Sequence, residues 1–176
     1  MKKKFFLLAA LFALLCMPSI LPAAYIFKDG RFIDVKDIAT LSVEEHYKLG
    51  IEALQKKDWP EAVHQFRVVT INFPLTSWGK ESFYFLGVAY YHVDDKELAN
   101  RNLSIYLSEE QNPQYYEETF RYKLAIADAF KDGARRHLFG YEKLPKWLPA
   151  KELAVNIYDE IAASLPSNDV AAKALL

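Results

Sequence analysis

The residues best suited to catalysis are few in this sequence, and they lie far apart. One cysteine, Cys16, and four histidines, His46, His64, His92 and His137, occur among its 176 residues. No two histidines have the spacing of metal ligands beside a carboxylate, and the sequence has no nucleophile elbow, glycine-rich phosphate loop or paired carboxylate motif. We therefore expect a protein that is not an enzyme and needs no metal or cofactor, with His46 packed inside a helical repeat.

The surroundings of Cys16 are those of an export signal. A basic start, residues 2–4, precedes an uncharged apolar run of 12 residues that ends at Cys16, and a short segment then leads to Ala23 and Ala24. The run is too short to span a bilayer, which needs roughly 20 residues. We predict that residues 1–24 are the signal peptide of an exported protein.

Two processing routes remain open at this signal. Ordinary signal peptidase cuts after small residues, which Ala23 and Ala24 provide. Lipoprotein processing instead cuts before a cysteine at the end of the apolar run, where Cys16 stands, but the residue before it is Leu15 rather than a small one. We predict lipidation of Cys16, and removal of this cysteine with the signal is the alternative.

The composition limits the mature chain to one domain and narrows its partners. About 150 residues remain after processing, which is enough for a single core. The formal net charge is -1 and no basic block follows the signal, so we expect no nucleic-acid partner. Without a pair of cysteines, the exported domain depends on packing rather than on disulfides.

From residue 40 onward the sequence indicates paired helices. Ser42 and Glu45 have the spacing of a capping box, in which each side chain bonds the backbone N–H of the other. Asp58 followed by Trp59 and Pro60 begins a second helix, because aspartate caps and proline fits the first turn. Only a few residues separate these two helices, so we expect an antiparallel helical hairpin.

The hairpin recurs at an offset of 37 residues. The shift places Gly50 on Gly87, Asp58 on Asp95 and Ala62 on Ala99. This spacing resembles the tetratricopeptide (TPR) pattern of helix pairs, in which small residues allow close helix contact. We predict an all-α TPR array, or α-solenoid, over residues 40–176. Its units are residues 42–76, 80–113 and 115–166, and a further helix starts in 168–176.

Two segments depart from the plain repeat. In the third unit, whose first helix we expect from Tyr115 to about Arg136, residues 135–149 stand where a short turn would suffice. Such a long loop is either functional or a tolerated insertion. Before the array, the alternating apolar residues around Asp29 and Gly30 predict an extended or β-hairpin segment over residues 25–39.

One stretch is more specific than a generic repeat. "FPLTSWGKESFYFLGVAYYHVDDKELANRNLSIYL", residues 73–107, is similar to the YfiO/ComL family of outer-membrane assembly lipoproteins, which includes BamD. The resemblance extends over residues 42–166. It implies a non-catalytic scaffold, lipid-anchored at the periplasmic face of the outer membrane, that binds β-barrel assembly subunits or unfolded outer-membrane proteins. A soluble periplasmic protein, or an envelope TPR adaptor for peptidoglycan synthesis or secretion, is the alternative.

The repeat register also predicts a binding groove along the first helix of each unit. Its inward positions would form an apolar, aromatic surface for a peptide or partner, with tyrosine hydroxyls available to backbone groups. In the alternative, these tyrosines only pack between helices. The predicted groove residues are Tyr47, Ile51 and Leu54 in the first unit, Tyr84, Val88 and Tyr91 in the second, and Tyr122 and Ile126 in the third.

Overall fold

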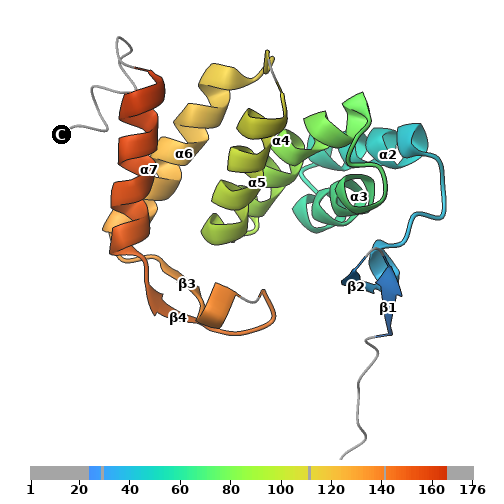
Figure 1. The fold of residues 1–176 in the computed structure, drawn as a ribbon, viewed down its shortest axis with the longest axis horizontal. Helices are drawn as coiled ribbons and strands as arrows, with labels where there is room; N and C mark the ends of the chain where they lie inside the picture. Colours follow the sequence, from blue (N-terminus) through green and yellow to red (C-terminus); the bar gives the residue numbers. More distant parts are fainter. Residues whose placement is uncertain (1–23, 29, 111, 141, 166–176) are drawn as a thin grey trace, which may run out of the picture. The chain divides into compact units, whose positions relative to one another are not determined.

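A computed structural model describes residues 24–28, 30–110, 112–140 and 142–165 of the chain. The predicted signal peptide with Cys16 and the further helix expected in 168–176 lie outside the described residues. The chain divides into an N-terminal unit that ends at Lys36 and a second unit from Asp37 onward. The α-helices of the described residues belong to the second unit (Figure 1).

The described part of the N-terminal unit is a β-hairpin. Strands β1 (Tyr25–Lys28) and β2 (Arg31–Asp34) pair antiparallel, with Tyr25 opposite Asp34. Gly30 between them has φ +79°, a left-handed conformation that glycine adopts without steric cost. The rings of Phe27 and Phe32 face each other across the pair at 5.2 Å, and the 3-10 turn η1 (Val35–Asp37) follows. The predicted hairpin is therefore confirmed.

The second unit contains an array of paired helices. α2 (Val43–Gln55) pairs with α3 (Trp59–Asn72), and α4 (Ser77–His92) pairs with α5 (Lys96–Glu109). Both expected starts are present: Ser42 and Glu45 form the capping box, and Asp58 accepts from the backbone N–H of Glu61. Asp95, one repeat later, caps α5 in the same way. The predicted all-α TPR array is confirmed.

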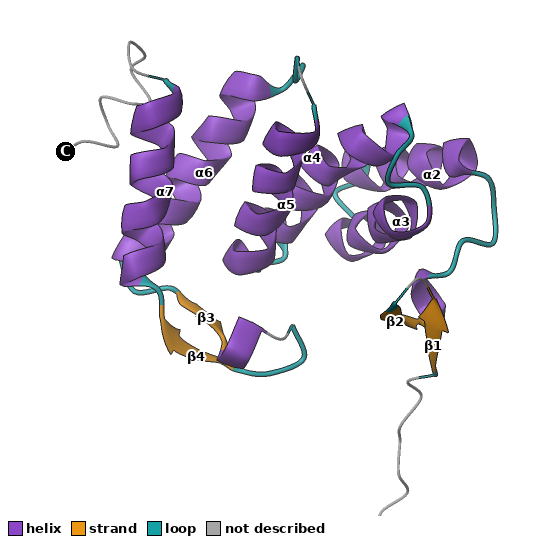
Figure 2. Ribbon diagram, viewed as in Figure 1, coloured by secondary structure: helices purple, strands orange, loops and turns teal. Residues whose placement is uncertain are grey.

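The third pair departs from the prediction at its first helix. α6 (Tyr116–Lys131) ends before the expected Arg136, because Gly133 turns the backbone to φ +109° and the N–H of Ala134 returns to the carbonyl of Ala129. The chain then forms strand β3 (Arg135–His137), the short turn η2 (Leu138–Gly140) and strand β4 (Lys146–Pro149) before α7 (Lys151–Ser164). Figure 2 shows this small hairpin, residues 135–149, beside the helices. We call it the arm.

The repeated glycines allow the helix pairs to touch, as the sequence predicts. A β-carbon at Gly50 would lie 2.7 Å from the ring of Phe66, and one at Gly87 would lie 2.7 Å from Cγ of Leu103. Gly79 is tighter still, because a β-carbon there would lie 2.0 Å from the backbone oxygen of Phe73. Close packing at these points sets the spacing of neighbouring helices.

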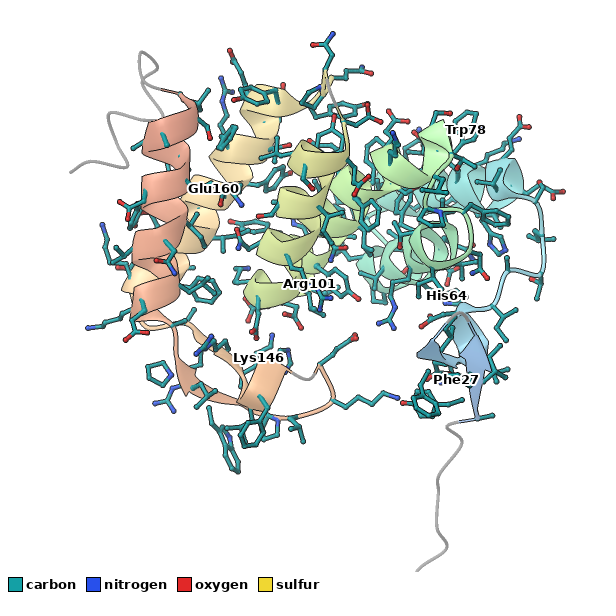
Figure 3. The ribbon with its side chains drawn as sticks, viewed as in Figure 1. Phe27, His64, Trp78, Arg101, Lys146 and Glu160 are labelled. Carbon is teal, nitrogen blue, oxygen red and sulfur yellow. The ribbon has the colours of Figure 1, made fainter. Side chains whose placement is uncertain are left out.

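A buried lysine joins the second and third helix pairs. Lys123 on α6 is fully buried, and its Nζ donates to Oδ1 of Asn100 at 2.9 Å and Oγ of Ser104 at 2.6 Å, both on α5. Its Nζ also lies 3.0 Å from a carboxylate oxygen of Glu160 on α7, labelled in Figure 3. Burial lowers the pKa of Lys123 in spite of this carboxylate. The contact between the pairs is thus partly polar.

Candidate partner-binding surface

The structure divides the eight predicted groove residues into two groups. Tyr84, Val88 and Ile126 are buried, and Tyr84 is only 7% exposed. The other five are half-buried against the core: Tyr47, Ile51, Leu54, Tyr91 and Tyr122. Tyr84 is therefore part of the core rather than of an accessible groove, and its ring stacks on Tyr115 with centroids 4.3 Å apart.

The first half-buried tyrosine belongs to an aromatic cluster between α2 and α4. The ring of Tyr47 lies 4.5 Å from Trp78, labelled in Figure 3, and 6.0 Å from Phe85. Phe85 in turn contacts Tyr84 at 5.2 Å and Tyr115 at 5.4 Å. Aromatic pairs at these distances stabilise one another edge to face or offset. Trp78 remains partly exposed, so this cluster reaches the surface.

Glu81 adds a carboxylate to this cluster. The hydroxyl of Tyr47 donates to Oε2 of Glu81 at 2.7 Å. Burial and this carboxylate raise the pKa of Tyr47 far above its ordinary value, and burial followed by Glu81 raises that of Tyr115. Both hydroxyls therefore stay protonated donors. No pattern in the sequence indicates Glu81, since only the fold brings a carboxylate of the second unit to a tyrosine of the first.

A second aromatic cluster joins α4 to α6. The rings of Tyr91 and Tyr122 meet edge to face at 5.2 Å. His92 contacts both tyrosines and stacks on Trp59 of α3 with centroids 4.0 Å apart. The ammonium of Lys96 lies 4.1 Å above the ring of Tyr91, a cation–π contact. The half-buried Tyr122 therefore adjoins Tyr91, and not the buried Tyr84, on the accessible side of these helices.

The arm is fastened to the start of α5 by His137. Its Nδ1 lies 2.6 Å from the carbonyl oxygen of Leu144, and its Nε2 lies 2.8 Å from Oδ2 of Asp95. Its backbone N–H donates to Glu97 at 2.8 Å. Both ring nitrogens face acceptors, so only the protonated imidazole can donate to both. Burial lowers the pKa of His137, but these two bonds and the charge of Asp95 raise it more, and the net pKa is above its ordinary value.

This geometry predicts that the stability of the arm depends on pH. A raised folded pKa means that the contribution of His137 is complete below about pH 6.5 and is lost as the pH rises through the folded value. We expect amide protection in the arm to fall between neutral and alkaline pH in the unaltered chain. Hydrogen exchange with His137→Asn as the control checks this, because the asparagine cannot titrate. Equal pH dependence in both chains would contradict the assignment.

Arg67 connects the arm to α3. Its guanidinium lies 2.7 Å from Oδ2 of Asp37, 2.7 Å from a carboxylate oxygen of Glu142 in the arm, and 3.1 Å from the hydroxyl of Tyr90. Burial lowers the pKa of Arg67, but the neighbouring Tyr90, Glu142 and Asp37 raise it more, so this side chain is a permanent cation. The cluster fixes one position of the arm against the helices, and no local sequence pattern indicates it.

Among the described residues, no group of three or more histidine, cysteine, aspartate or glutamate side chains could hold a metal ion. No helix in the described part of the chain is long and apolar enough to cross a membrane. The side-chain contacts instead join helices, tie down the arm and leave two aromatic clusters partly accessible.

Comparison with known proteins agrees with the resemblance seen in the sequence. The model of the YfiO family, described as an outer membrane lipoprotein, matches residues 40–138. No curated protein matches the chain. The matched region covers more than half of the 176 residues and runs from the start of the first helix pair to the first strand of the arm. The chain therefore belongs to the YfiO family of TPR-containing outer membrane lipoproteins.

Proposed function

We propose that this protein is a non-enzymatic scaffold of the BamD type that binds partner proteins in outer-membrane β-barrel protein assembly. The observation that carries the proposal is the family match over the helical array. The array itself supports it, because stacked helix pairs present an extended surface built from successive first helices. An envelope TPR adaptor for peptidoglycan synthesis or secretion has the same architecture and is the alternative.

The proposed location is the periplasmic face of the outer membrane, with a lipid on Cys16 as the anchor. The family description, outer membrane lipoprotein, supports the anchor. The apolar run that ends at Cys16 supports it as well, whereas Leu15 favours the soluble alternative. Acyl-chain labelling of the unaltered chain and of Cys16→Ser tests the anchor. We expect label in the unaltered chain and none in Cys16→Ser, and absence of label from both would show that the cysteine leaves with the signal.

The proposed partner-binding surface consists of the five half-buried groove residues with Trp78. Tyr47, Ile51 and Leu54 provide one part on α2, and Tyr91 with Tyr122 provides the other. The core beneath this surface includes the three buried groove residues, Tyr84, Val88 and Ile126. Aromatic anchors that are partly buried before binding lose little side-chain entropy when a partner docks, which suits them to dominate an interface.

Truncating Tyr91 is expected to weaken the binding of an unfolded outer-membrane β-barrel segment by about 30-fold, which corresponds to a loss of roughly 2 kcal/mol at an aromatic anchor. Tyr91 is only half-buried, and the contacts it loses are an edge-to-face pairing with Tyr122 and a cation–π contact with Lys96, so the fold should persist. Titration of Tyr91→Ala with a fluorescent peptide checks this. Tyr84→Ala, at another predicted groove position, is unsuitable because removing a buried ring destabilises the core.

The matched control is Tyr158→Ala on α7. Tyr158 is also half-buried, but its hydroxyl bonds to Asp128 outside the proposed surface. Its removal should leave the affinity unchanged. If Tyr91→Ala and Tyr158→Ala bind the peptide alike and as tightly as the unaltered chain, the aromatic surface is not the binding site.

A further inference from the structure

The arm is positively charged in a protein whose net charge is slightly negative. The segment from Arg135 to Lys151 contains five basic residues and a single acidic one, Glu142, against a formal net charge of -1 for the whole chain. Both carboxylate oxygens of Glu142 bond to Arg67, so this acid is already paired with a cation of α3. Arg135, Arg136 and Lys151 are exposed. The arm, together with Lys151 at the start of α7, is therefore a local cationic surface.

The two strands of the arm have an inner and an outer face. His137 and Lys146 lie opposite each other in the pair and face the start of α5, where His137 bonds Asp95 and the ammonium of Lys146 donates to the carbonyl of Asp94. Figure 3 shows Lys146 on β4 at this position. The register of the pair shifts beside these two residues, so that Trp147 is an extra residue without a partner across the pair. Its side chain is 64% exposed.

Phe139, at the turn of the arm, is a second exposed aromatic residue in an unfavourable conformation. Its side chain is 81% exposed, and its backbone has φ 54°, in the left-handed region that aromatic residues rarely adopt. Gly140 beside it has φ +71° and carries no such cost. At this exposure, packing against the described residues repays little of the strain, and strain of this kind is typical of functional sites.

A hollow next to Trp147 is suited to a small anionic group. It measures about 290 Å³ and lies between the arm and the start of α7. Phe130 and Pro149 contribute apolar walls, and Arg135 and Lys151 contribute two cations. A lipid phosphate with the first part of its acyl chains has this combination of charge and apolar surface.

We propose that the arm is a contact site for anionic phospholipid headgroups, with Trp147 and Phe139 entering the membrane interface and Arg135, Arg136 and Lys151 meeting the phosphates. Tryptophan and basic side chains are the residues that favour the boundary between headgroups and acyl chains. Members of this family are outer membrane lipoproteins, so a bilayer lies within reach of the chain. The site is separate from the aromatic clusters on α2, α4 and α6 and does not depend on partner binding.

The test measures the environment of Trp147 in the full chain bound to vesicles. Brominated lipids quench tryptophan inside the bilayer, so an N-terminal anchor alone gives no signal from the arm. Trp147→Phe isolates the contribution of Trp147 from those of Trp59 and Trp78. We expect Trp147 to be quenched in vesicles containing phosphatidylglycerol and to be unquenched in vesicles of phosphatidylcholine alone.

The charge dependence is measured with Arg135→Gln/Arg136→Gln. Each basic residue contributes on the order of 1 kcal/mol near an anionic surface, so this variant should shift the equilibrium about 30-fold toward the unquenched state. Arg101→Gln/Arg121→Gln, which removes two exposed cations from α5 and α6, should leave quenching unchanged. Unquenched Trp147 in phosphatidylglycerol vesicles, or equal quenching in both double variants, would overturn the proposal. Photo-crosslinking from position 139 to protein instead of lipid would also overturn it.

Discussion

Arg67→Met is expected to lower the free energy of unfolding by about 3 kcal/mol, which is the lower end for breaking a buried ion pair. The reason is Asp37, whose side chain is only 8% exposed and whose carboxylate lies 2.7 Å from the guanidinium. Methionine fills much of the same space but leaves this carboxylate buried without a cation. Glu142 is more exposed and water can solvate it, so its loss of Arg67 adds little. Denaturant unfolding measures the change.

Two further variants separate this charge effect from a general loss of packing. Arg101→Met on the exposed side of α5 removes the same side chain and should change stability by less than about 0.5 kcal/mol. Arg67→Met/Asp37→Leu removes both charges and should recover most of the loss, since a buried pair can often be replaced by apolar residues. If Arg67→Met alone is as stable as the unaltered chain, the Arg67 cluster does not hold the arm and the turn at Asp37.

The helical array could be predicted from the sequence because its signals are local. A capping box needs only Ser42 and Glu45, and a close helix contact needs only a glycine such as Gly50 or Gly87 at the repeat position. Each of these depends on residues within one helix pair, and the offset of 37 repeats the glycine of the first pair in the second. The N-terminal hairpin could be predicted for the same reason, from alternation around a single turn.

The arm and its contacts could not be predicted in this way. Arg67 and Glu142 are 75 residues apart, and His137 and Asp95 are 42 apart, so no periodic pattern relates them. Asp95 repeats Asp58 in sequence and also caps its helix, yet Asp58 is exposed and Asp95 is buried beneath the arm. The repeat correctly predicted that Asp95 caps α5 through one carboxylate oxygen. Only the three-dimensional structure shows that the other oxygen bonds to His137.

The repeat register was not sufficient to predict which groove residues are accessible. Register correctly places Tyr47, Tyr84 and Tyr122 on successive first helices. The exposure of each tyrosine depends instead on what packs against it. Tyr115, in the segment between α5 and α6, stacks on Tyr84 and covers it. The surface that remains accessible therefore passes through Tyr91, and Tyr84 supports it from the core.

Mild crosslinking of the full chain in its native membranes tests the central claim, that this is a scaffold for outer-membrane β-barrel assembly. The family match and the aromatic surface lead us to expect a large β-barrel assembly protein among the crosslinked partners. Tyr91→Ala/Tyr122→Ala should reduce its recovery at least tenfold, because each truncated aromatic anchor costs more than about 1 kcal/mol. Tyr158→Ala should recover as much as the unaltered chain. Recovery of peptidoglycan-synthesis enzymes without any β-barrel assembly protein would contradict the claim.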